Sequence, residues 1–254
     1  MDQTLLRLDG LTKRFGGVLA LRDVSFCVHA GEIVGLIGPN GSGKTTLFNC
    51  ITGFLTPDPP SDVMLFGRRV VGMRPDQIAR LGMVRTFQEV RVFKQLSVMD
   101  NLLMAVQQHQ EDKLGNRFIN TPRVQAFEAQ GKDRASELLE MVGLQAHAGT
   151  PAGLLSYGQR KLLTFIFALM PEHPLVLLDE PAAAVNPALI DRLKAYIMRQ
   201  NRRGTTFLLV EHNMDVVMDI CQRIVVLDHG EKIAEGVPEA IQKNKRVLDA
   251  YFGI

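Results

Sequence analysis

Eight consecutive residues have the types and the spacing that bind a phosphate group. Residues 38–45 read Gly-Pro-Asn-Gly-Ser-Gly-Lys-Thr, which fits the pattern GxxxxGK[ST]. An apolar run at 32–37 precedes them and a helical pattern at 45–52 follows, as the pattern requires. Glycines let successive backbone N–H groups surround a phosphate, and the helix N-terminus adds partial positive charge. We expect nucleotide contacts from Gly38, Pro39, Asn40, Gly41, Ser42, Gly43, Lys44, Thr45 and Thr46.

Four side chains of this motif and of a later strand suit metal-assisted hydrolysis. Lys44 is expected to reach the β- and γ-phosphates, and the Thr45 hydroxyl to ligate Mg²⁺. The apolar strand 175–178 ends in Asp179 and Glu180. Because the carboxyl ends of parallel strands face the ligand crevice, we expect Asp179 to complete the Mg²⁺ shell through water. Glu180 is placed to polarise an attacking water. Alone, the two acids fit an ordinary charged turn equally well.

The elements that position these groups alternate between strand and helix in the second half of the chain. Strands are expected at 175–178, 206–210 and 223–227, and helices at 155–170, 187–203 and 214–221. This alternation predicts an α/β fold with a parallel sheet. Residues 89–155 have almost no strand signal, which suggests an inserted helical subdomain.

The remaining patterned segments lie in the first half and at the end. Residues 5–8 predict an edge strand, and 97–110 and 124–141 predict amphipathic helices. The polar stretch 107–123 is interpreted as a surface loop or insertion. A final helix is expected to start within 238–242.

Composition excludes several classes of protein. The chain has 254 residues, with 29 Lys and Arg against 27 Asp and Glu, so its formal net charge is +2. A charge this small predicts no nucleic-acid partner and no direct binding to an anionic membrane surface. The apolar stretch 162–170 has about half of the ~20 residues that a membrane span needs, and residues 1–3 open no secretory signal. The three cysteines are an odd number and have no CxxC spacing, which suggests reduced thiols in a cytosolic protein: Cys27, Cys50 and Cys221.

Further motifs carry a resemblance to a known family. Residues 155–159 read Leu-Ser-Tyr-Gly-Gln, which resembles the LSGGQ signature of ATP-binding cassette (ABC) ATPases. His212 stands where that family has its switch histidine, and Gln88, within Thr-Phe-Gln, matches its Q-loop. Phe15 lies before the phosphate motif, where the family places an aromatic ring that stacks on adenine. The motifs occur in family order across nearly the whole chain.

The resemblance implies a fold and a division of the chain. The fold is the P-loop NTPase fold of ABC ATPases, an α/β fold with a mixed β-sheet core, an inserted helical subdomain and an N-terminal antiparallel β portion. A single ABC ATPase domain is implied over residues 1–254. Its core is expected at 1–88 and 156–254, and its helical subdomain at 89–155.

The signature suggests a second phosphate site. Ser156 and Gln159 form a capping-box pattern at the start of an apolar helix, which exposes helix N–H groups. Within the resembling family, two subunits pair head to tail. The resemblance thus implies that Ser156, Gly158 and Gln159 of one subunit close on ATP held by Lys44 of the other.

The resemblance also implies roles for the remaining motif residues. Glu180 acts as general base or orients the water, and His212 hydrogen-bonds the γ-phosphate. Gln88 touches Mg²⁺ or the attacking water and reports phosphate occupancy to the helical subdomain. The implied cofactors are ATP and Mg²⁺.

A closer resemblance is to the ATPase subunits of bacterial branched-chain amino acid importers. It is carried by residues 84–93, by Tyr157 in the signature, by the 107–123 insertion and by the Tyr-Phe-Gly end at 251–253. It implies transmembrane permease subunits as partners, a second ATPase subunit in a homo- or heterodimer, and indirectly a periplasmic or extracellular substrate-binding protein. It places the chain peripherally on the cytoplasmic face of the inner membrane, docked through the segment 88–104.

Four positions depart from the wider family pattern. Tyr157 replaces the first glycine of the signature pair, and Asn186 stands where many members have an aspartate. Phe167 replaces a common arginine, and residues 58–61 lack the glycines common after the first helix. None of these positions belongs to the hydrolytic chemistry itself.

Three alternatives stay open. A non-transport ABC ATPase acting on ribosomes or DNA usually has tandem cassettes or long coiled-coil insertions, which this sequence lacks. A signalling P-loop GTPase would have an NKxD motif, and none occurs. Another cargo, such as urea, amides or lipopolysaccharide, fits the same motifs because cargo contacts lie in partner proteins.

Overall fold

The computed structural model describes residues 3–86, 92–107, 122–183 and 186–252. The chain forms two compact units. The first, termed the sheet unit, comprises Met1–Arg85, His173–Val185 and Ile197–Ile254. The second, termed the helical unit, comprises Thr86–Glu172 and Asn186–Tyr196.

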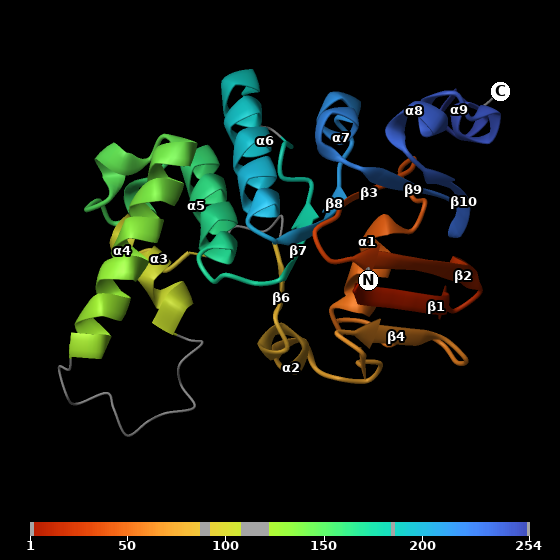
Figure 1. Cartoon of the computed structure of the whole chain (residues 1–254), viewed down its shortest axis with the longest axis horizontal. Coiled ribbons are helices and arrows are strands. Elements are labelled where there is room, and N and C mark those ends of the chain that lie inside the picture. The colour runs from red at the N-terminus through yellow and green to blue at the C-terminus, as the bar shows by residue number, and fades with distance from the viewer. Residues whose placement is uncertain (1–2, 87–91, 108–121, 184–185, 253–254) are drawn as a thin grey trace. The chain divides into compact units, whose positions relative to one another are not determined.

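The sheet unit contains a four-stranded antiparallel sheet with the order β2-β1-β4-β5. Figure 1 shows β2, β1 and β4 side by side in this order. Its strands are β1 (Thr4–Phe15), β2 (Val18–His29), β4 (Asp62–Leu65) and β5 (Arg68–Arg69). The expectation of an edge strand at residues 5–8 was wrong, because β1 pairs with β2 on one side and with β4 on the other. Two neighbours protect both edges of β1, and its four leucines are buried: Leu5, Leu6, Leu8 and Leu11.

The second sheet has six strands in the order β10-β9-β3-β8-β7-β6. Its strands are β3 (Ile33–Ile37), β6 (Met83–Arg85), β7 (Leu175–Asp179), β8 (Thr206–Val210), β9 (Arg223–Asp228) and β10 (Glu231–Gly236). All neighbours are parallel except β10, which forms an antiparallel hairpin with β9. The predicted mixed sheet and N-terminal antiparallel portion are thus confirmed. Every residue of β3, β7 and β8 is buried, as expected for parallel strands covered on both faces.

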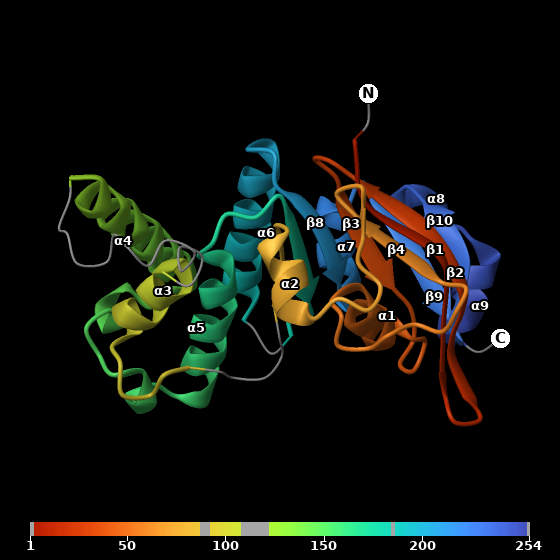
Figure 2. The same cartoon turned by 90° about the horizontal axis from the view of Figure 1, so that it is seen from below.

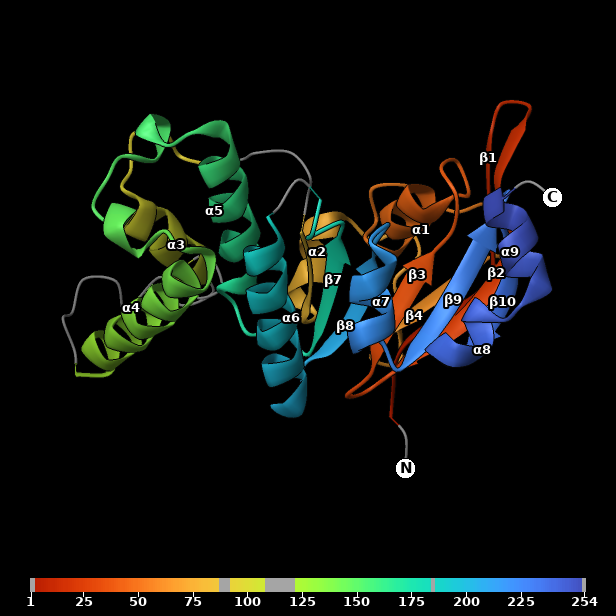
Figure 3. The same ribbon diagram turned by 90° about the horizontal axis from the view of Figure 1, so that it is seen from above.

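The two faces of β3 meet different partners. Helix α1 (Lys44–Ile51) contributes Phe48 to a buried core that also holds apolar side chains of both sheets. On the other face of β3 lies α7 (Met214–Ile220), visible in front of the sheet in Figure 3. A Cβ atom on Gly35 would lie 3.1 Å from both Val217 and Cys221 side-chain atoms, so glycine suits this close packing of β3 against α7.

Three further helices end or connect the sheet unit. They are α2 (Pro75–Arg80), α8 (Pro238–Gln242) and α9 (Lys245–Phe252). Helix α9 was not predicted. A local signal for it exists, because the Asn244 side chain accepts hydrogen bonds from the Arg246 and Val247 N–H groups at 3.0 and 3.4 Å, in the manner of an N-cap. A further helix, α6 (Pro187–Arg202), begins in the helical unit and ends in the sheet unit.

The helical unit is built from α3 (Val98–Gln107), α4 (Pro122–Val142) and α5 (Tyr157–Leu169) (Figure 2). Two short 3-10 helices, η2 (Gln145–His147) and η3 (Ala152–Leu154), connect α4 to α5. Helix α3 packs against α4 and α5. This packing places residues 156–172 in the helical unit, whereas we expected them in the core.

Two predicted boundaries around the insertion change. The loop expected at 107–123 includes Pro122 and Arg123, which belong to the first turn of α4, where proline is favoured. The helix expected at 97–110 ends at Gln107, and residues 108–110 lie outside the described part. Among the described residues, no helix is long and apolar enough to cross a membrane.

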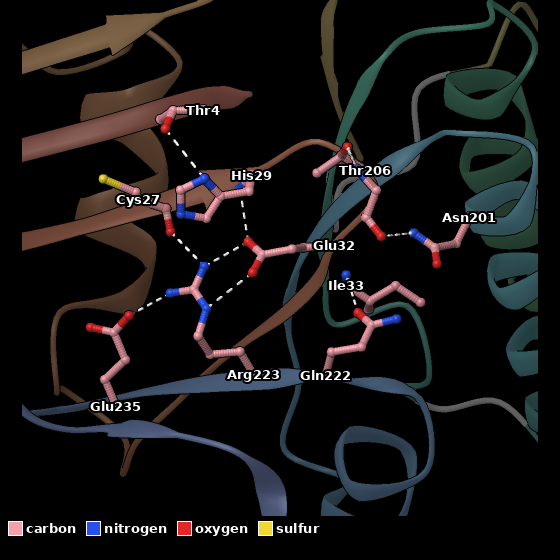
Figure 4. A network of polar contacts seen from close by, with 11 residues as sticks. Thr4, Cys27, His29, Glu32, Ile33, Asn201, Thr206, Gln222, Arg223 and Glu235 are labelled. Carbon is pink, nitrogen blue, oxygen red and sulfur yellow. Dashed lines mark hydrogen bonds and ion pairs between the residues drawn. The ribbon is translucent and has the colours of Figure 1, made fainter. Parts of the chain in front are cut away.

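A polar network joins the two sheets at the start of β3 (Figure 4). The Arg223 guanidinium donates to Glu32 Oε2 at 2.6 Å and to the Cys27 carbonyl at 2.8 Å, and it also pairs with Glu235. The Glu32 carboxylate accepts a second bond from the His29 N–H at 2.7 Å. The network therefore ties β2, β9 and β10 together at the end of β3 opposite the phosphate motif.

Candidate active site

The phosphate motif forms a tight loop between β3 and α1 that only glycine permits at two positions. Gly38 has φ 151°, and a Cβ there would lie 2.1 Å from the Leu227 carbonyl oxygen. Gly43 has φ 102°, and a Cβ there would lie 2.7 Å from the Ala20 carbonyl oxygen. Both residues combine a backbone conformation and a close approach that exclude a side chain. This loop conformation therefore requires glycine at both positions.

Lys44 points into this loop. Its Nζ donates to the carbonyl oxygens of Gly38 and Pro39 at 2.7 and 3.0 Å, and the residue is 6% exposed. Burial lowers the pKa of Lys44, while the charges of Glu180 and Asp179 oppose that shift. A partly desolvated cation near two carboxylates is suited to bind the anionic oxygens of a phosphate chain.

Asp179 ends β7 and is held by a residue that the sequence analysis missed. Arg85, on β6, donates from Nη2 to Asp179 Oδ2 at 2.7 Å, and these side chains are 6% and 7% exposed. The same guanidinium bonds Asn49 Oδ1 at 2.7 Å, which links the carboxylate to α1. Its carbon also lies 5.3 Å from the centre of the Phe48 ring. No local motif marks Arg85, since its partner lies 94 residues away.

Glu180 and His212 come together at the ends of neighbouring strands. The His212 Nε2 atom lies 3.0 Å from Glu180 Oε1. Glu180 has φ 49°, a left-handed conformation that is costly for a residue with a side chain and typical of functional sites. Its N–H donates to the Val210 carbonyl at 2.9 Å, a hydrogen bond between the ends of β7 and β8. The structure therefore joins two residues that were expected in one site.

The predicted metal ligands fit Mg²⁺ when a nucleotide is also present. Thr45 lies in the first turn of α1 and is exposed, and Asp179 supplies a carboxylate. Hydroxyl and carboxylate oxygens are donors that this hard cation prefers. The described residues contain no group of three His, Cys, Asp or Glu side chains able to hold a metal by themselves. The remaining positions would thus fall to water and phosphate oxygens, as is usual for Mg²⁺ with nucleotides.

Phe15 lies at the end of β1, where the chain turns into β2, and is partly exposed. The ring is 46% exposed, and Lys13 Nζ lies 5.7 Å from its centre. Lys13 is itself fixed by a 2.7 Å bond to the Thr56 carbonyl. An exposed ring on a rigid hairpin is suited to stack on a base.

The signature residues lie at the N-terminus of α5 in the helical unit. The predicted capping box is confirmed: the Ser156 side chain accepts from the Gln159 N–H at 3.2 Å, and the Gln159 side chain accepts from the Ser156 N–H at 2.9 Å. Gly158 is exposed, with open space where a Cβ would stand. Asn186, one of the departures, accepts from the Leu189 N–H at 2.9 Å and so caps α6. Gln88 lies outside the described residues.

The unpredicted helix α9 also approaches the phosphate loop. A cavity of about 510 Å³ borders Asn40 and Ser42 on one side and Arg246 and Asp249 of α9 on the other. Burial raises the pKa of Tyr251, on the same helix, and the Gly38 backbone opposes the shift. The C-terminal helix is thus a neighbour of the loop.

A glycine loop between a buried parallel strand and a helix, with Lys44 inside it and carboxylates at the adjacent strand end, defines a P-loop nucleotide hydrolase. Residues 21–183, more than half of the chain, match the ABC transporter family. Residues 231–253 match the family described as branched-chain amino acid ATP-binding cassette transporter. The chain belongs to the ABC transporter family of ATP-binding proteins, whose general activity is ATP hydrolysis.

Individual relatives match this chain over its full length. The chain is 43% identical to the high-affinity branched-chain amino acid transport ATP-binding protein LivG of Salmonella typhimurium, covering 100% of this chain and 99% of the relative. It is 41% identical to the corresponding protein BraF of Pseudomonas aeruginosa, with the same coverage. A crystal structure of an ATP-binding cassette of an ABC transporter in its ADP conformation has 32% identity and a TM-score of 0.80, over 99% of both chains.

Proposed function

We propose that this chain is the ATP-hydrolysing subunit of a membrane importer for branched-chain amino acids. The observation that carries the proposal is the similarity to LivG over the entire length, including the C-terminal segment 231–253. The relatives named above are transport proteins, which gives no support to a ribosome- or DNA-associated role. The motifs by themselves would also suit urea, amides or lipopolysaccharide.

The geometry of the sheet unit supports a division of labour in hydrolysis. Lys44 offsets the negative charge that develops on the transferred phosphate. Glu180 orients the attacking water and accepts its proton, and His212, 3.0 Å from it, holds the carboxylate toward the γ-phosphate. Thr45 and Asp179 would hold Mg²⁺, which supplies further charge neutralisation at the phosphates. Phe15 positions the adenine.

The proposal includes a second ATPase subunit. In each chain, Lys44 lies in the sheet unit and Ser156 in the helical unit. A head-to-tail dimer brings Ser156, Gly158 and Gln159 of one subunit to the nucleotide held by the other. Binding of ATP closes the dimer, and hydrolysis reopens it. Gln88 relays phosphate occupancy to the helical unit.

The proposed partners follow from this cycle. The chain lies peripherally on the cytoplasmic face of the membrane and contacts permease subunits through the segment 88–104. A substrate-binding protein outside the membrane delivers the amino acid to the permease. The chain itself contacts no amino acid.

The variant Glu180→Gln tests the hydrolytic site. We expect it to bind ATP and to lose turnover by about 100-fold or more, because glutamine cannot accept the proton. It should then accumulate as a closed dimer with ATP, measured by sedimentation. Glu140→Gln, at an exposed site in the helical unit, serves as the control. Normal turnover of Glu180→Gln contradicts the assignment.

A further inference from the structure

A buried carboxylate outside the predicted motifs joins the turns that carry Glu180 and His212. Glu211 follows β8 directly and is 3% exposed. Its Oε1 atom accepts from the Ala182 N–H at 2.6 Å, and its Oε2 atom accepts from the N–H groups of His212 and Asn213 at 3.0 and 3.3 Å. One oxygen thus binds the turn after β7, and the other binds the turn after β8.

The strand pairing explains why one side chain reaches both turns. In the parallel ladder, Asp179 of β7 stands opposite Val210 of β8. The segments that follow β7 and β8 diverge after this pair. Glu180 adopts its left-handed conformation, and the Ala183 N–H closes a turn onto the Glu180 carbonyl at 3.1 Å. Glu211 lies where the two segments diverge, and its hydrogen bonds connect them beyond the strand pairing.

Because of these partners, we assign the buried Glu211 carboxylate a structural role in the site and no role as a proton acceptor. Burial raises the pKa of Glu211, and hydrogen bonds from the Ala182, Asn213 and His212 backbone oppose that shift. Its oxygens are engaged by three N–H groups, and the residue is almost inaccessible to water. Hydrogen bonds to a charged acceptor are about twice as strong as neutral ones, so they hold the turns firmly.

We propose that Glu211 is a positioning residue for hydrolysis, which fixes the separation of Glu180 and His212 by binding the backbone of both turns. The proposal rests on the proposed roles of Glu180 and His212. Glu180 and His212 meet at 3.0 Å although 32 residues separate them, and each belongs to a turn bound by Glu211. If that connection loosens, the Glu180 carboxylate loses its orientation while the nucleotide-binding loop is unaffected.

The variant Glu211→Gln separates positioning from folding. Glutamine has nearly the same shape, but its NH₂ group cannot accept from a backbone N–H, so one turn loses its bond. We expect kcat for ATP hydrolysis to fall about 10-fold, as for loss of one charge-assisted hydrogen bond, and KM for ATP to change less than about twofold. Glu32→Gln is the structural control, since Glu32 lies in the network at the opposite end of β3. It should lower thermal stability and leave kcat unchanged.

A double-mutant cycle with His212→Ala shows whether Glu211 acts through the pair. In the His212→Ala background, we expect Glu211→Gln to change kcat by less than about twofold, because the contact that it positions is gone. An unchanged kcat in Glu211→Gln, or an equally large effect in both backgrounds, overturns the proposal. Should Glu211→Gln fold poorly, Glu211→Asp, which is one methylene too short to reach both turns, is measured in the same way.

A spectroscopic readout is independent of turnover. In the nucleotide-free protein, the NMR signal of the His212 imidazole should shift in Glu211→Gln, while that of His147, in the helical unit, should not. An unmoved His212 signal overturns the proposal. Wild-type turnover in both Glu180→Gln and His212→Ala would instead refute the assigned site, and the His212 signal would still test the link to Glu211.

Discussion

Replacing Arg85 by methionine removes one partner of a buried ion pair and tests whether that pair stabilises the sheet unit. Arg85 and Asp179 are 2.7 Å apart and 6% and 7% exposed, so solvent hardly screens them. Removing one partner of such a pair costs roughly 3 to 5 kcal/mol, because the other buried charge loses an interaction that water cannot replace. Methionine fills much of the arginine volume, so lost packing adds little. We therefore expect Arg85→Met to lower the free energy of unfolding of the sheet unit by about 3 kcal/mol.

The assay must report the sheet unit separately from the helical unit. Hydrogen exchange of the buried amides in β7 and β8 does so, because these strands belong to the sheet unit alone. Arg22→Met is the matched control: its ion pair with Glu231 is largely exposed, and loss of such a pair costs about 0 to 1 kcal/mol.

The double variant Arg85→Met/Asp179→Asn isolates the interaction. With both charges gone, the penalty for a buried carboxylate that has lost its guanidinium partner is removed, so the double variant should be more stable than Arg85→Met alone, by roughly 2 kcal/mol. A loss below about 1 kcal/mol in Arg85→Met, or strict additivity in the double variant, would refute the reasoning.

Three other predictions concern separate features. Phe15→Ala should weaken ATP binding by about 1 to 3 kcal/mol through lost base stacking, with kcat at saturation unchanged. Equilibrium titration with a fluorescent ATP analogue measures the affinity, and an unchanged affinity contradicts the role of the ring. Burial raises the pKa of Cys50 to about 11 and of Cys221 to about 12. At pH 8 iodoacetamide should therefore modify the partly exposed Cys27 first and the other two cysteines only after unfolding. Mass spectrometry shows the order of modification, and early labelling of Cys221 would be inconsistent with the core packing. Although burial opposes it, Lys232 and Arg223 lower the pKa of Glu235 below its ordinary 4.5. The ionised Glu235 carboxylate therefore stabilises the fold above pH 4.5, and this contribution is lost as the pH falls through the pKa of the folded state. In acid unfolding, the stability of Glu235→Gln should depend less on pH in that range than the stability of the wild type. Equal dependence argues against the ion pair.

The parts of the site that the sequence predicted are those whose chemistry is local. The phosphate loop needs glycines, Lys44 and Thr45 at fixed spacing between a strand and a helix, and all of these are adjacent in the chain. The capping box of Ser156 and Gln159 is also local, and the structure contains it. Strand β8 has the predicted bounds, 206–210, and β-branched residues stand at both of its ends.

The parts that the sequence did not predict depend on tertiary contacts. The role of Arg85 depends on its hydrogen bond with Asp179, 94 residues away, and the role of Glu211 depends on its bond with the turn at Ala182, 29 residues away. Strand β6 has three residues, too few for a hydrophobic period, and it exists because β7 pairs with it. The interior position of β1 likewise follows from pairing with β4, which no pattern within residues 5–8 contains.

Energised uptake in a reconstituted system tests the central claim most directly. The chain is placed in membrane vesicles with the permease subunits and the substrate-binding protein that we propose as its partners. Uptake of radiolabelled leucine, isoleucine and valine is measured with ATP on the side of the chain. We predict ATP-dependent uptake with the wild-type chain and none with Glu180→Gln. Equal uptake with both, or uptake of urea, amides or another cargo in place of these amino acids, would contradict the account.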